Sequence, residues 1–299
     1  MGLERASTQV TGMDRTVVLG GSGFVGRELR DQFACIGTSL TPREGFLEVD
    51  ATRFDDLREK LSPLNPEVLV NCVGLADVDR AEREPDLAVS LNVGVVKNLV
   101  RLQQEMDFQL VHISTDYVFD GAQGMYGETD PVHPINEYGR SKLNGEQAAL
   151  RAHQPLLLRI SSPFGRGYGA RKPQFFRYVT DNLRSGKPVR ALMDQRVTAT
   201  FLPDLARAIE ILARRSVSGI VHVGSAQPLT RFEFAQEIAK VVGADPGLVA
   251  PGLRSDMKQW TAPRPADTSL NVEHSLGLGV RYTPVEAALT ELLSGDGSH

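Results

Sequence analysis

Hydrophobic runs and helical periodicities alternate through the first half of the chain. Short runs rich in β-branched residues are followed by segments whose hydrophobic residues recur every three to four positions, which is typical of βαβ units and a parallel sheet. Residues 68–73 (VLVNCV) resemble a strand that is buried on both faces. Strands are expected at 16–19, 37–40, 68–73 and 109–114, and helices at 24–33 and 85–104. We therefore predict an α/β fold built on a parallel sheet.

The pattern becomes less regular after about residue 150. Strands are expected at 156–160 and 220–223, helices at 203–214 and 231–242, and a loop-rich stretch with several prolines at 243–268. With no internal repeat or low-complexity linker, the second half is expected to form a small α/β C-terminal lobe packed on the sheet domain. The predicted division is a flexible N-terminal extension at 1–14, the sheet domain at 15–160, the lobe at 161–294 with some segments returning to the sheet domain, and a tail at 295–299.

Composition and charge narrow the class of protein. Hydrophobic residues make up 41% of the 299 residues and charged residues 23%, as in soluble globular proteins. The net charge of −4 gives no reason to expect a nucleic-acid partner. No hydrophobic run approaches the roughly 20 residues of a membrane-spanning helix, and the start of the chain lacks a secretory signal. Cys35 and Cys72 lie in separate hydrophobic stretches, so we expect buried thiols, no disulfide and a cytoplasmic protein.

Glycines recur directly after the first expected strand. Residues 20–26 read GGSGFVG and lead straight into the expected helix at 24–33. Glycine permits a tight turn and a close approach of the backbone to a pyrophosphate, and the start of the helix points unpaired amides at the anion. We therefore interpret the sheet domain as a dinucleotide-binding domain. The residues expected to contact the cofactor here are Gly20, Ser22, Gly23, Phe24, Val25 and Gly26.

The end of the second expected strand bears on the choice of cofactor. An acidic residue there binds the ribose hydroxyls of NAD, whereas a basic residue accepts the 2′-phosphate of NADP. Thr41 stands where an acid is expected and Arg43 follows two residues later, although Glu44 is adjacent. We therefore expect NADPH, with NADH possible. Asp50 and Ala51 follow at a point where this fold brings a side chain near the adenine.

A tyrosine and a lysine four residues apart, Tyr138 and Lys142, would lie one turn apart on the same face of a helix. Reduction of a carbonyl group needs a proton donor, and a phenol is a slow acid unless a neighbouring cation lowers its pKa. Lys142 would do so and could also hold the nicotinamide ribose. Thr115 follows a buried strand at the sheet edge where open α/β sheets bind ligands. It could orient the carbonyl oxygen, a role for which Ser114 competes, so the predicted catalytic residues are Thr115, Tyr138 and Lys142.

Together these motifs resemble those of the dTDP-4-dehydrorhamnose reductase family within the extended short-chain dehydrogenases. The matching segments are residues 20–26, 71–79, 81–82, 114–121, 126–130, 134–142, 145–146, 159–161, 194–195, 198, 204–206 and 264–265. The resemblance covers nearly the whole chain and implies a Rossmann-type, doubly wound parallel sheet with a small C-terminal lobe. It implies that the lobe at 161–294 binds the substrate and that a hydride passes from NAD(P)H to the 4-keto group of a nucleotide-linked deoxysugar.

The resemblance also implies further contacts. Val73 and Gly74 would contact the cofactor. Asp116, Tyr117 and Ser161 would line the sugar pocket, and Arg264 would reach the diphosphate, although it could equally cap the lobe. The expected partner is therefore a nucleotide-sugar substrate, with a homodimer as an option.

Other activities of the same scaffold stay open. An epimerase is one, whereas a dehydratase is disfavoured because Tyr117 follows Asp116 where a second carboxylate is needed. A non-catalytic regulator resembling the regulatory subunit of methionine adenosyltransferase is the alternative outside enzymes. Residues 159–165 (RISSPFG) lack the aromatic residue that such reductases often carry after their Arg-x-Ser segment, so the sugar can differ from rhamnose. The histidines show no ligand spacing, and no metal is expected.

Overall fold

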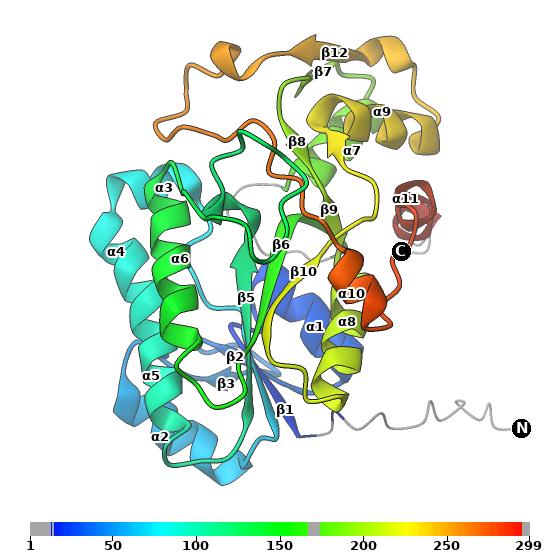
Figure 1. The fold of residues 1–299 in the computed structure, drawn as a ribbon. Coiled ribbons are helices and arrows are strands. Elements are labelled where there is room, and N and C mark those ends of the chain that lie inside the picture. Colours follow the sequence, from blue (N-terminus) through cyan, green and yellow to red (C-terminus); the bar gives the residue numbers. More distant parts are fainter. Residues whose placement is uncertain (1–12, 14, 167–173, 295–299) are drawn as a thin grey trace, which may run out of the picture.

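The chain forms a parallel sheet with a smaller lobe above its carboxyl edge (Figure 1). The computed structural model describes residues 13, 15–166 and 174–294. The strands of the large sheet are β1 (Thr16–Leu19), β2 (Ile36–Ser39), β3 (Leu47–Glu48), β4 (Val68–Asn71), β5 (Gln109–Thr115), β6 (Leu156–Phe164), β9 (Ala199–Phe201) and β10 (Gly219–Val223). Their order is β10-β6-β5-β4-β1-β2-β3, β9 also pairs with β6, and every pair is parallel.

Helices cover both faces of this sheet. On one face α1 (Phe24–Phe33) and α8 (Leu202–Arg214) share a hydrophobic core with Val18, whereas α2 (Phe54–Leu61), α5 (Val95–Leu102) and α6 (Glu137–Ala149) share another with Val17 and Leu19. Adjacent residues of β1 thus serve opposite cores, because side chains alternate along a strand. The predicted doubly wound α/β fold is confirmed.

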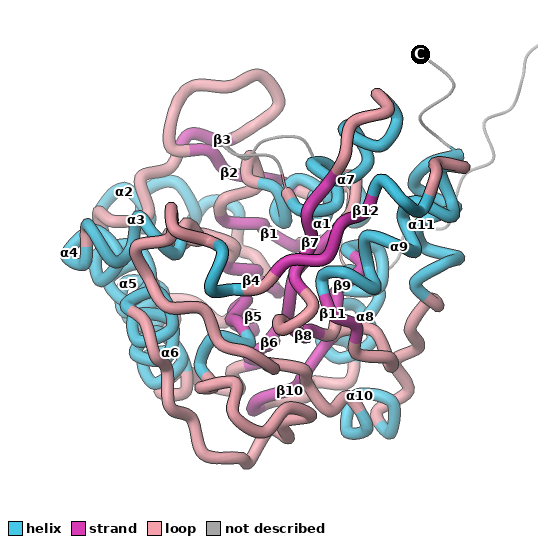
Figure 2. The backbone as a smooth tube through the Cα atoms, turned by 90° about the horizontal axis from the view of Figure 1, so that it is seen from above, coloured by secondary structure: helices cyan, strands magenta, loops and turns pink. Residues whose placement is uncertain are grey.

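The lobe has a core of its own. Its elements are α7 (Phe175–Arg184), α9 (Arg231–Val242), α11 (Val285–Ser294), β7 (Val189–Leu192), β8 (Arg196–Val197), β11 (Leu229–Thr230) and β12 (Val249–Gly252). β12 pairs with β7 in parallel and β11 with β8 antiparallel. Phe164 meets Phe201 and Phe234 at ring-centroid distances of 5.4 and 5.2 Å, and these rings fill the centre of the lobe. Figure 2 shows the lobe strands β7 and β12 crossing over the large sheet.

The helix expected at 85–104 is present but is not uniform. It consists of α4 (Pro85–Val89), a π-helical turn η2 (Ser90–Gly94) and α5. π-turns inside helices often mark functional sites. The remaining short helices are α3 (Val78–Arg83), α10 (Glu273–Gly277) and the single turns η1 (Ser62–Leu64), η3 (Asp116–Val118), η4 (Pro246–Leu248) and η5 (Arg254–Asp256).

Several sequence expectations concern other parts of the chain. Met13, within the expected extension, is 2% exposed in the core beneath β1, and the rest of that extension and the expected tail lie outside the described residues. Cys35 and Cys72 are free thiols, and both are partly covered, so the prediction that they are buried is confirmed only in part. No helix in the described ranges is long and hydrophobic enough to span a bilayer.

Candidate active site

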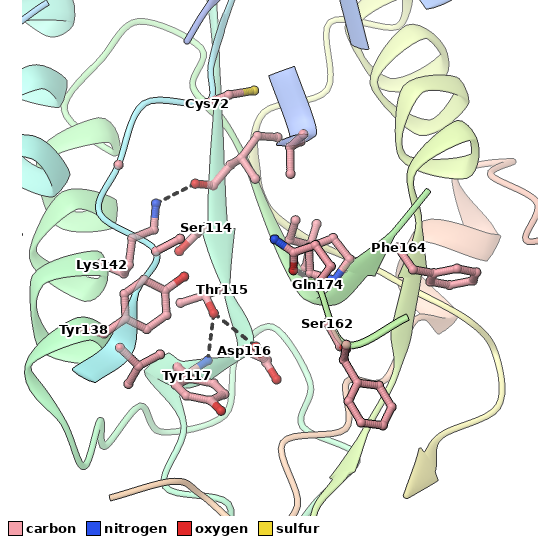
Figure 3. A pocket seen from close by; sticks show the side chains of 18 of the residues that line it. Cys72, Ser114, Thr115, Asp116, Tyr117, Tyr138, Lys142, Ser162, Phe164 and Gln174 are labelled. Atoms are coloured by element: carbon pink, nitrogen blue, oxygen red, sulfur yellow. Dashed lines mark hydrogen bonds between the residues drawn. The ribbon is translucent and has the colours of Figure 1, made fainter. Parts of the chain in front are cut away.

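A cavity of about 370 Å³ lies between the carboxyl ends of β4, β5 and β6 and the lobe helices α7 and α9. The predicted site residues that line it are Val25, Val73, Gly74, Thr115, Asp116, Tyr117, Tyr138 and Lys142. Figure 3 shows Thr115, Tyr138 and Lys142 on one wall, facing Ser162, Gln174 and Phe164 on the other. The fold therefore brings the three predicted catalytic side chains into one cavity.

Tyr138 and Lys142 occupy the first two turns of α6. The helix begins at Asn136, whose Oδ1 accepts a hydrogen bond from the Gly139 amide at 2.8 Å. A β-carbon at position 139 would collide with the carbonyl oxygen of Tyr117, so glycine lets α6 lie directly against the end of β5. The Lys142 ammonium donates to the carbonyl oxygen of Ile113 at 2.7 Å. Both side chains are thereby aimed into the cavity.

Thr115 ends β5 with its hydroxyl beside the cavity. Its Oγ1 donates to Asp116 Oδ1 at 3.1 Å and accepts from the Tyr117 amide at 3.2 Å. The competing hydroxyl of Ser114 instead donates to the buried carboxylate of Glu146 at 2.5 Å. Of the two adjacent hydroxyls, that of Thr115 is therefore the better placed to meet a ligand.

Burial dominates the protonation of this site. It raises the pKa of the Tyr138 phenol above its ordinary value, against the influence of Thr115. It lowers the pKa of Lys142 to about 8, although the negative charge of Glu146 acts in the other direction. The net shift of the Tyr138 pKa is therefore opposite to the lowering that the sequence led us to expect from Lys142, because burial, together with the negative charge of Asp116, disfavours the phenolate. At neutral pH the phenol is protonated and the lysine is largely an ammonium.

Asp116 lies beside these groups but is already fully engaged. Its carboxylate accepts hydrogen bonds from the hydroxyls of Thr115, Thr268 and Ser161, the last at 2.7 Å. Burial raises its pKa, and the three hydroxyls oppose that rise. Asp116 therefore orients its neighbours, above all the hydroxyl of Thr115.

The glycine loop has the geometry that a pyrophosphate requires. Gly20 has a φ of 74°, and a β-carbon on Gly21 would lie 2.6 Å from the Cα of Gly37 in β2. At Gly26 a β-carbon would collide with the carbonyl oxygen of Gly20. Helix α1 starts at Gly23 with no side-chain cap and no acidic residue in its first turn, so its amides are free to face an anion. The residues present fit a dinucleotide.

The residues expected to select the cofactor lie outside this cavity. Arg43 is exposed on the loop after β2. Asp50 borders a separate hollow with Leu40, and its Oδ1 accepts from both the amide and the hydroxyl of Thr52, at 3.0 and 2.6 Å. Ala51 is buried in the core beside α2. Asp50 thus shapes the turn into α2.

Two residues expected to contact the substrate are engaged elsewhere. Ser161 is 0% exposed, does not line the cavity and donates to Asp116, whereas its neighbour Ser162 does line it. A register shift in β6 between residues 161 and 164, together with a φ of 43° at Ser162, turns that residue inward. Arg264 is paired with Asp79, with Nη2 and Oδ2 2.9 Å apart. The ion pair of Arg264 with Asp79 thus joins the lobe to the sheet domain.

Arg231 is the functional candidate that the sequence did not reveal. It begins α9 and lines the main cavity together with Ser162. Its guanidinium donates to the Ser162 hydroxyl and, at 3.4 Å, to Gln195 Oε1, and it lies 4.9 Å from the centre of the Phe175 ring. Its hydrogen-bond and ring partners are neutral, and the carboxylate of Asp116 acts on it only through space. The guanidinium can therefore still bind an anionic group of a ligand.

A second hollow continues from the first. The two share Tyr117, Phe175 and Arg231 as lining residues. The wall of the second hollow also contains Tyr178, Gln195, Met257, Gln259, Trp260 and Arg264. Aromatic rings with amide side chains between them suit a flat, polar ring system. Arg231 therefore lies where the two hollows meet.

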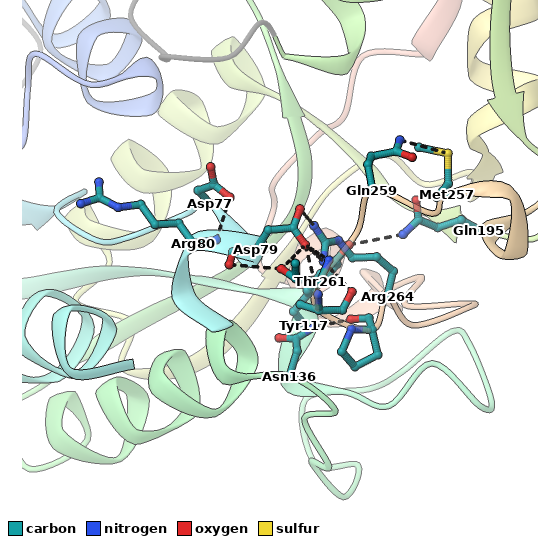
Figure 4. Close-up of polar contacts among 12 residues, drawn as sticks. Asp77, Asp79, Arg80, Tyr117, Asn136, Gln195, Met257, Gln259, Thr261 and Arg264 are labelled. Atoms are coloured by element: carbon teal, nitrogen blue, oxygen red, sulfur yellow. Dashed lines mark hydrogen bonds and ion pairs between the residues drawn. The ribbon is translucent and has the colours of Figure 1, made fainter. Parts of the chain in front are cut away.

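Residues 257–264 form a strap that contributes Met257, Gln259, Trp260 and Arg264 to the wall of this second hollow. Figure 4 shows Thr261 and Arg264 of the strap beside Asp79. Asp79, at the start of α3, accepts from the amides of Thr261 and Ala262 at 2.9 and 3.1 Å and from the Arg264 guanidinium. Burial raises the pKa of Asp79, but the hydrogen bonds from Arg264 and the strap outweigh it and leave the pKa lowered. The strap is thus tied to the sheet domain by a charged group.

The sequence and fold of the chain are similar to those of known proteins. The sequence profile of a family described as "RmlD substrate binding domain" matches residues 14–296. A probable low-salt glycan biosynthesis reductase of Haloferax volcanii is 33% identical, covering 92% of this chain and 96% of its own. The dTDP-4-dehydrorhamnose reductase of Mycolicibacterium smegmatis is 34% identical, with coverages of 89% and 80%.

Two further similarities bear on cofactor and activity. The crystal structure of dTDP-4-dehydrorhamnose reductase from Bacillus anthracis in complex with NADP superposes with a TM-score of 0.84 at 25% identity, covering 94% of this chain and 99% of that one. Methionine adenosyltransferase 2 subunit beta of Danio rerio is 29% identical, covering 93% and 90% of the two chains.

Proposed function

Because this chain belongs to the RmlD substrate binding domain family, and so is an NAD(P)-dependent oxidoreductase, we propose that it reduces the 4-keto group of a nucleotide-linked deoxysugar. The observation that carries the proposal is the convergence of Thr115, Tyr138 and Lys142 on one cavity. The glycine loop, which fits a dinucleotide, begins where β1 ends, and Val25 of α1 reaches the same cavity. Carbonyl reduction uses a hydride source, a proton donor and a group that orients the oxygen, and these elements supply all three.

The residues of the chain have distinct roles in the proposed reaction. NADPH, when bound, supplies the hydride. Thr115 holds the substrate oxygen by a hydrogen bond, and Tyr138 gives that oxygen its phenolic proton as the carbonyl π electrons move onto it. The raised pKa of Tyr138 keeps the proton in place until negative charge develops on the substrate. Lys142, an ammonium below pH about 8, stabilises the phenolate that results and holds the cofactor ribose.

The cavity also suggests how a nucleotide-sugar is held. We infer that the sugar lies beside Thr115 and the base lies in the second hollow against Trp260 and Tyr178. The diphosphate then falls at the junction, where Arg231 can bind it with a planar fork of donors. The lobe at 161–294 is accordingly the substrate-binding part, and Asp116 and Tyr117 border the sugar.

NADPH is the proposed cofactor, with NADH as the less favoured donor. Arg43 is exposed on the loop after β2 and can move toward a 2′-phosphate, with Gly20, Ser22, Gly23, Phe24, Val25, Gly26, Val73 and Gly74 along the dinucleotide. Asp50 and Ala51 would lie at its adenine end. The negative charge of Glu44 on the same loop makes the preference a quantity to measure.

A regulatory role is the second candidate, and the similarity to methionine adenosyltransferase 2 subunit beta favours testing it. Such a protein would bind the cofactor without turnover. It would also copurify with a methionine adenosyltransferase and change the rate of that enzyme.

The experiment is an oxidation assay with each cofactor. A dehydratase generates a dTDP-4-keto-6-deoxysugar in place, and the loss of nicotinamide absorbance is followed with NADPH and with NADH. Oxidation that depends on the keto sugar and is faster with NADPH is expected. Detectable binding of the cofactor with no oxidation of either one contradicts the proposal and favours the regulator.

A further inference from the structure

Glu146 forms a fully buried ion pair directly behind the cavity. The carboxylate and the Arg159 guanidinium are joined by two hydrogen bonds, Nε to Oε1 at 3.0 Å and Nη2 to Oε2 at 2.8 Å. The two residues are 1% and 2% exposed. Taking two charges out of water is costly, and a well-packed hydrophobic pair is often as stable. A role other than stabilising the fold would account for these charges.

The position of Glu146 connects it to two members of the proposed catalytic set, Lys142 and Thr115. It lies one turn after Lys142 on α6. It accepts the hydroxyl of Ser114, the residue before Thr115, and Arg159 is the register partner of Ser114 in β6. Lys142 itself bonds the carbonyl of Ile113, one residue earlier on β5. The two side chains of α6 thus hold successive residues of the strand that ends in Thr115.

The charges around Lys142 make Glu146 the important neighbour. Two other titratable groups interact electrostatically with Lys142: Cys72, which follows β4, and His112 on β5. Burial raises the pKa of Cys72 to about 12 and lowers that of His112 well below its ordinary value, so both are neutral near pH 7. Behind Glu146 lie Arg159 on β6 and, beyond it, His222 on β10, whose ring nitrogen is 3.4 Å from Nη1 of Arg159.

We propose that Glu146 is a positioning residue for Lys142: its carboxylate, held in place by Arg159 and Ser114, keeps the buried lysine an ammonium and fixes the register of α6 on β5. The inference rests on the proposed function in one respect, namely that the ammonium form of Lys142 is the form used in the reaction. Loss of the carboxylate removes the charge that opposes the burial of Lys142. The lysine then loses its proton at a lower pH.

The test is an NMR titration of the full chain labelled with 13C at the lysine ε carbons, and it does not depend on turnover. The Lys142 resonance is assigned by its loss in Lys142→Met. In Glu146→Gln the midpoint for Lys142 is expected to fall by about one pH unit. Glu146→Asp, which keeps the carboxylate, should restore most of it. Ser114→Ala is the matched control, because it removes a hydrogen bond to Oε1 of Glu146 without changing a charge. It should leave the Lys142 midpoint within about 0.3 pH unit of the wild-type value.

Two results would overturn the proposal: an unmoved midpoint in Glu146→Gln, or an equal shift in Ser114→Ala, which would mean that packing controls the lysine. If Glu146→Gln does not fold with Arg159 left unpaired, the double variant Glu146→Gln/Arg159→Gln removes the carboxylate without leaving an unpaired ion. Its midpoint should also fall, but by less than in the single variant, because loss of the positive charge of Arg159 acts in the opposite direction. Variants that are active in the oxidation assay should also show a shift in the basic limb of the pH profile of kcat/KM, and this shift should follow the NMR midpoint of Lys142. If the chain has no reductase activity, the titration still decides whether Glu146 sets the charge of Lys142.

Discussion

The hydroxyl of Thr115 is directed at the carboxylate of Asp116, with 3.1 Å between Oγ1 and Oδ1. Asp116 holds that orientation because the hydroxyls of Ser161 and Thr268 bind its other oxygen. The Thr115 oxygen in turn accepts the amide of Tyr117. These contacts fix the position of the Thr115 oxygen before any ligand arrives. Its one hydroxyl proton points at Asp116, so it has to turn toward a substrate oxygen in order to donate to it.

Replacement of Thr115 separates its hydroxyl from its shape. Thr115→Val keeps the volume but removes the hydroxyl, so kcat/KM is expected to fall about 10- to 100-fold, which corresponds to one hydrogen bond to a charged group. Thr115→Ser keeps the hydroxyl and should stay within about threefold of the wild type. Steady-state kinetics of both variants decide the point. Equal losses in the two would assign the residue to packing.

Replacement of Tyr138 tests the proton donor. Tyr138→Phe removes only the phenolic oxygen, and turnover should fall by about 10²- to 10⁴-fold, the usual contribution of a positioned general acid. Cofactor affinity, measured by quenching of protein fluorescence, should change little, since the ring that packs against Tyr117 stays. Wild-type turnover in this variant would exclude Tyr138 as the donor.

The pH dependence of the reaction should reflect Lys142. Its ammonium is the form proposed to act, and with a pKa of about 8 this form is lost as the pH rises through that value, so kcat/KM should decline above pH 8. The phenol of Tyr138 has a raised pKa and stays protonated over this range. Deprotonation of Lys142 does not itself promote unfolding: its folded pKa lies below the ordinary value of 10.5, so between about pH 8 and 10.5 this group stabilises the fold increasingly as the pH rises. A profile that is flat to pH 10 would count against the assignment.

Arg231 offers a test of the diphosphate site. Arg231→Gln should raise KM for the nucleotide-sugar about 10- to 100-fold, because a charge-assisted hydrogen bond is lost, while the affinity for NADPH is unchanged. Arg231→Lys keeps the charge but lacks the planar fork of donors, so its KM should lie between those of the wild type and Arg231→Gln. Arg214→Gln, on the outer surface of α8, is the control. An unchanged KM in Arg231→Gln would remove this residue from the substrate site.

The sheet domain was predictable from sequence because its signals are local. The predicted bounds of β1, α1 and α9 coincide with those observed. Strand β6 extends to Phe164, four residues beyond the prediction. Pro163 and the left-handed backbone of Ser162 interrupt the strand pattern, so the sequence predicted an end at residue 160. Because of the same irregularity, Ser162 lines the cavity where the sequence predicted Ser161.

The residues that the sequence could not place depend on contacts between the two halves of the chain. Arg264 meets Asp79 across 185 residues, and no local pattern encodes that pair. Arg231 did leave a signal: a cation in the first turn opposes the helix dipole, so its presence at the start of α9 calls for another reason. By contrast, the spacing of Tyr138 and Lys142 within one helix was sufficient to predict that they share a face, and both line the cavity.

The measurement that tests the central proposal most directly is the transfer of deuterium from NADPH labelled at C4 of the nicotinamide. The dTDP-4-keto-6-deoxysugar is reduced in ordinary water and the product is examined by mass spectrometry and NMR. We expect a product heavier by about one mass unit, with the deuterium on C4 of the sugar and no label lost to solvent, because hydride moves directly between the two carbons within the enclosed cavity. An unlabelled sugar product, or one labelled at another carbon, would contradict direct 4-keto reduction by this site.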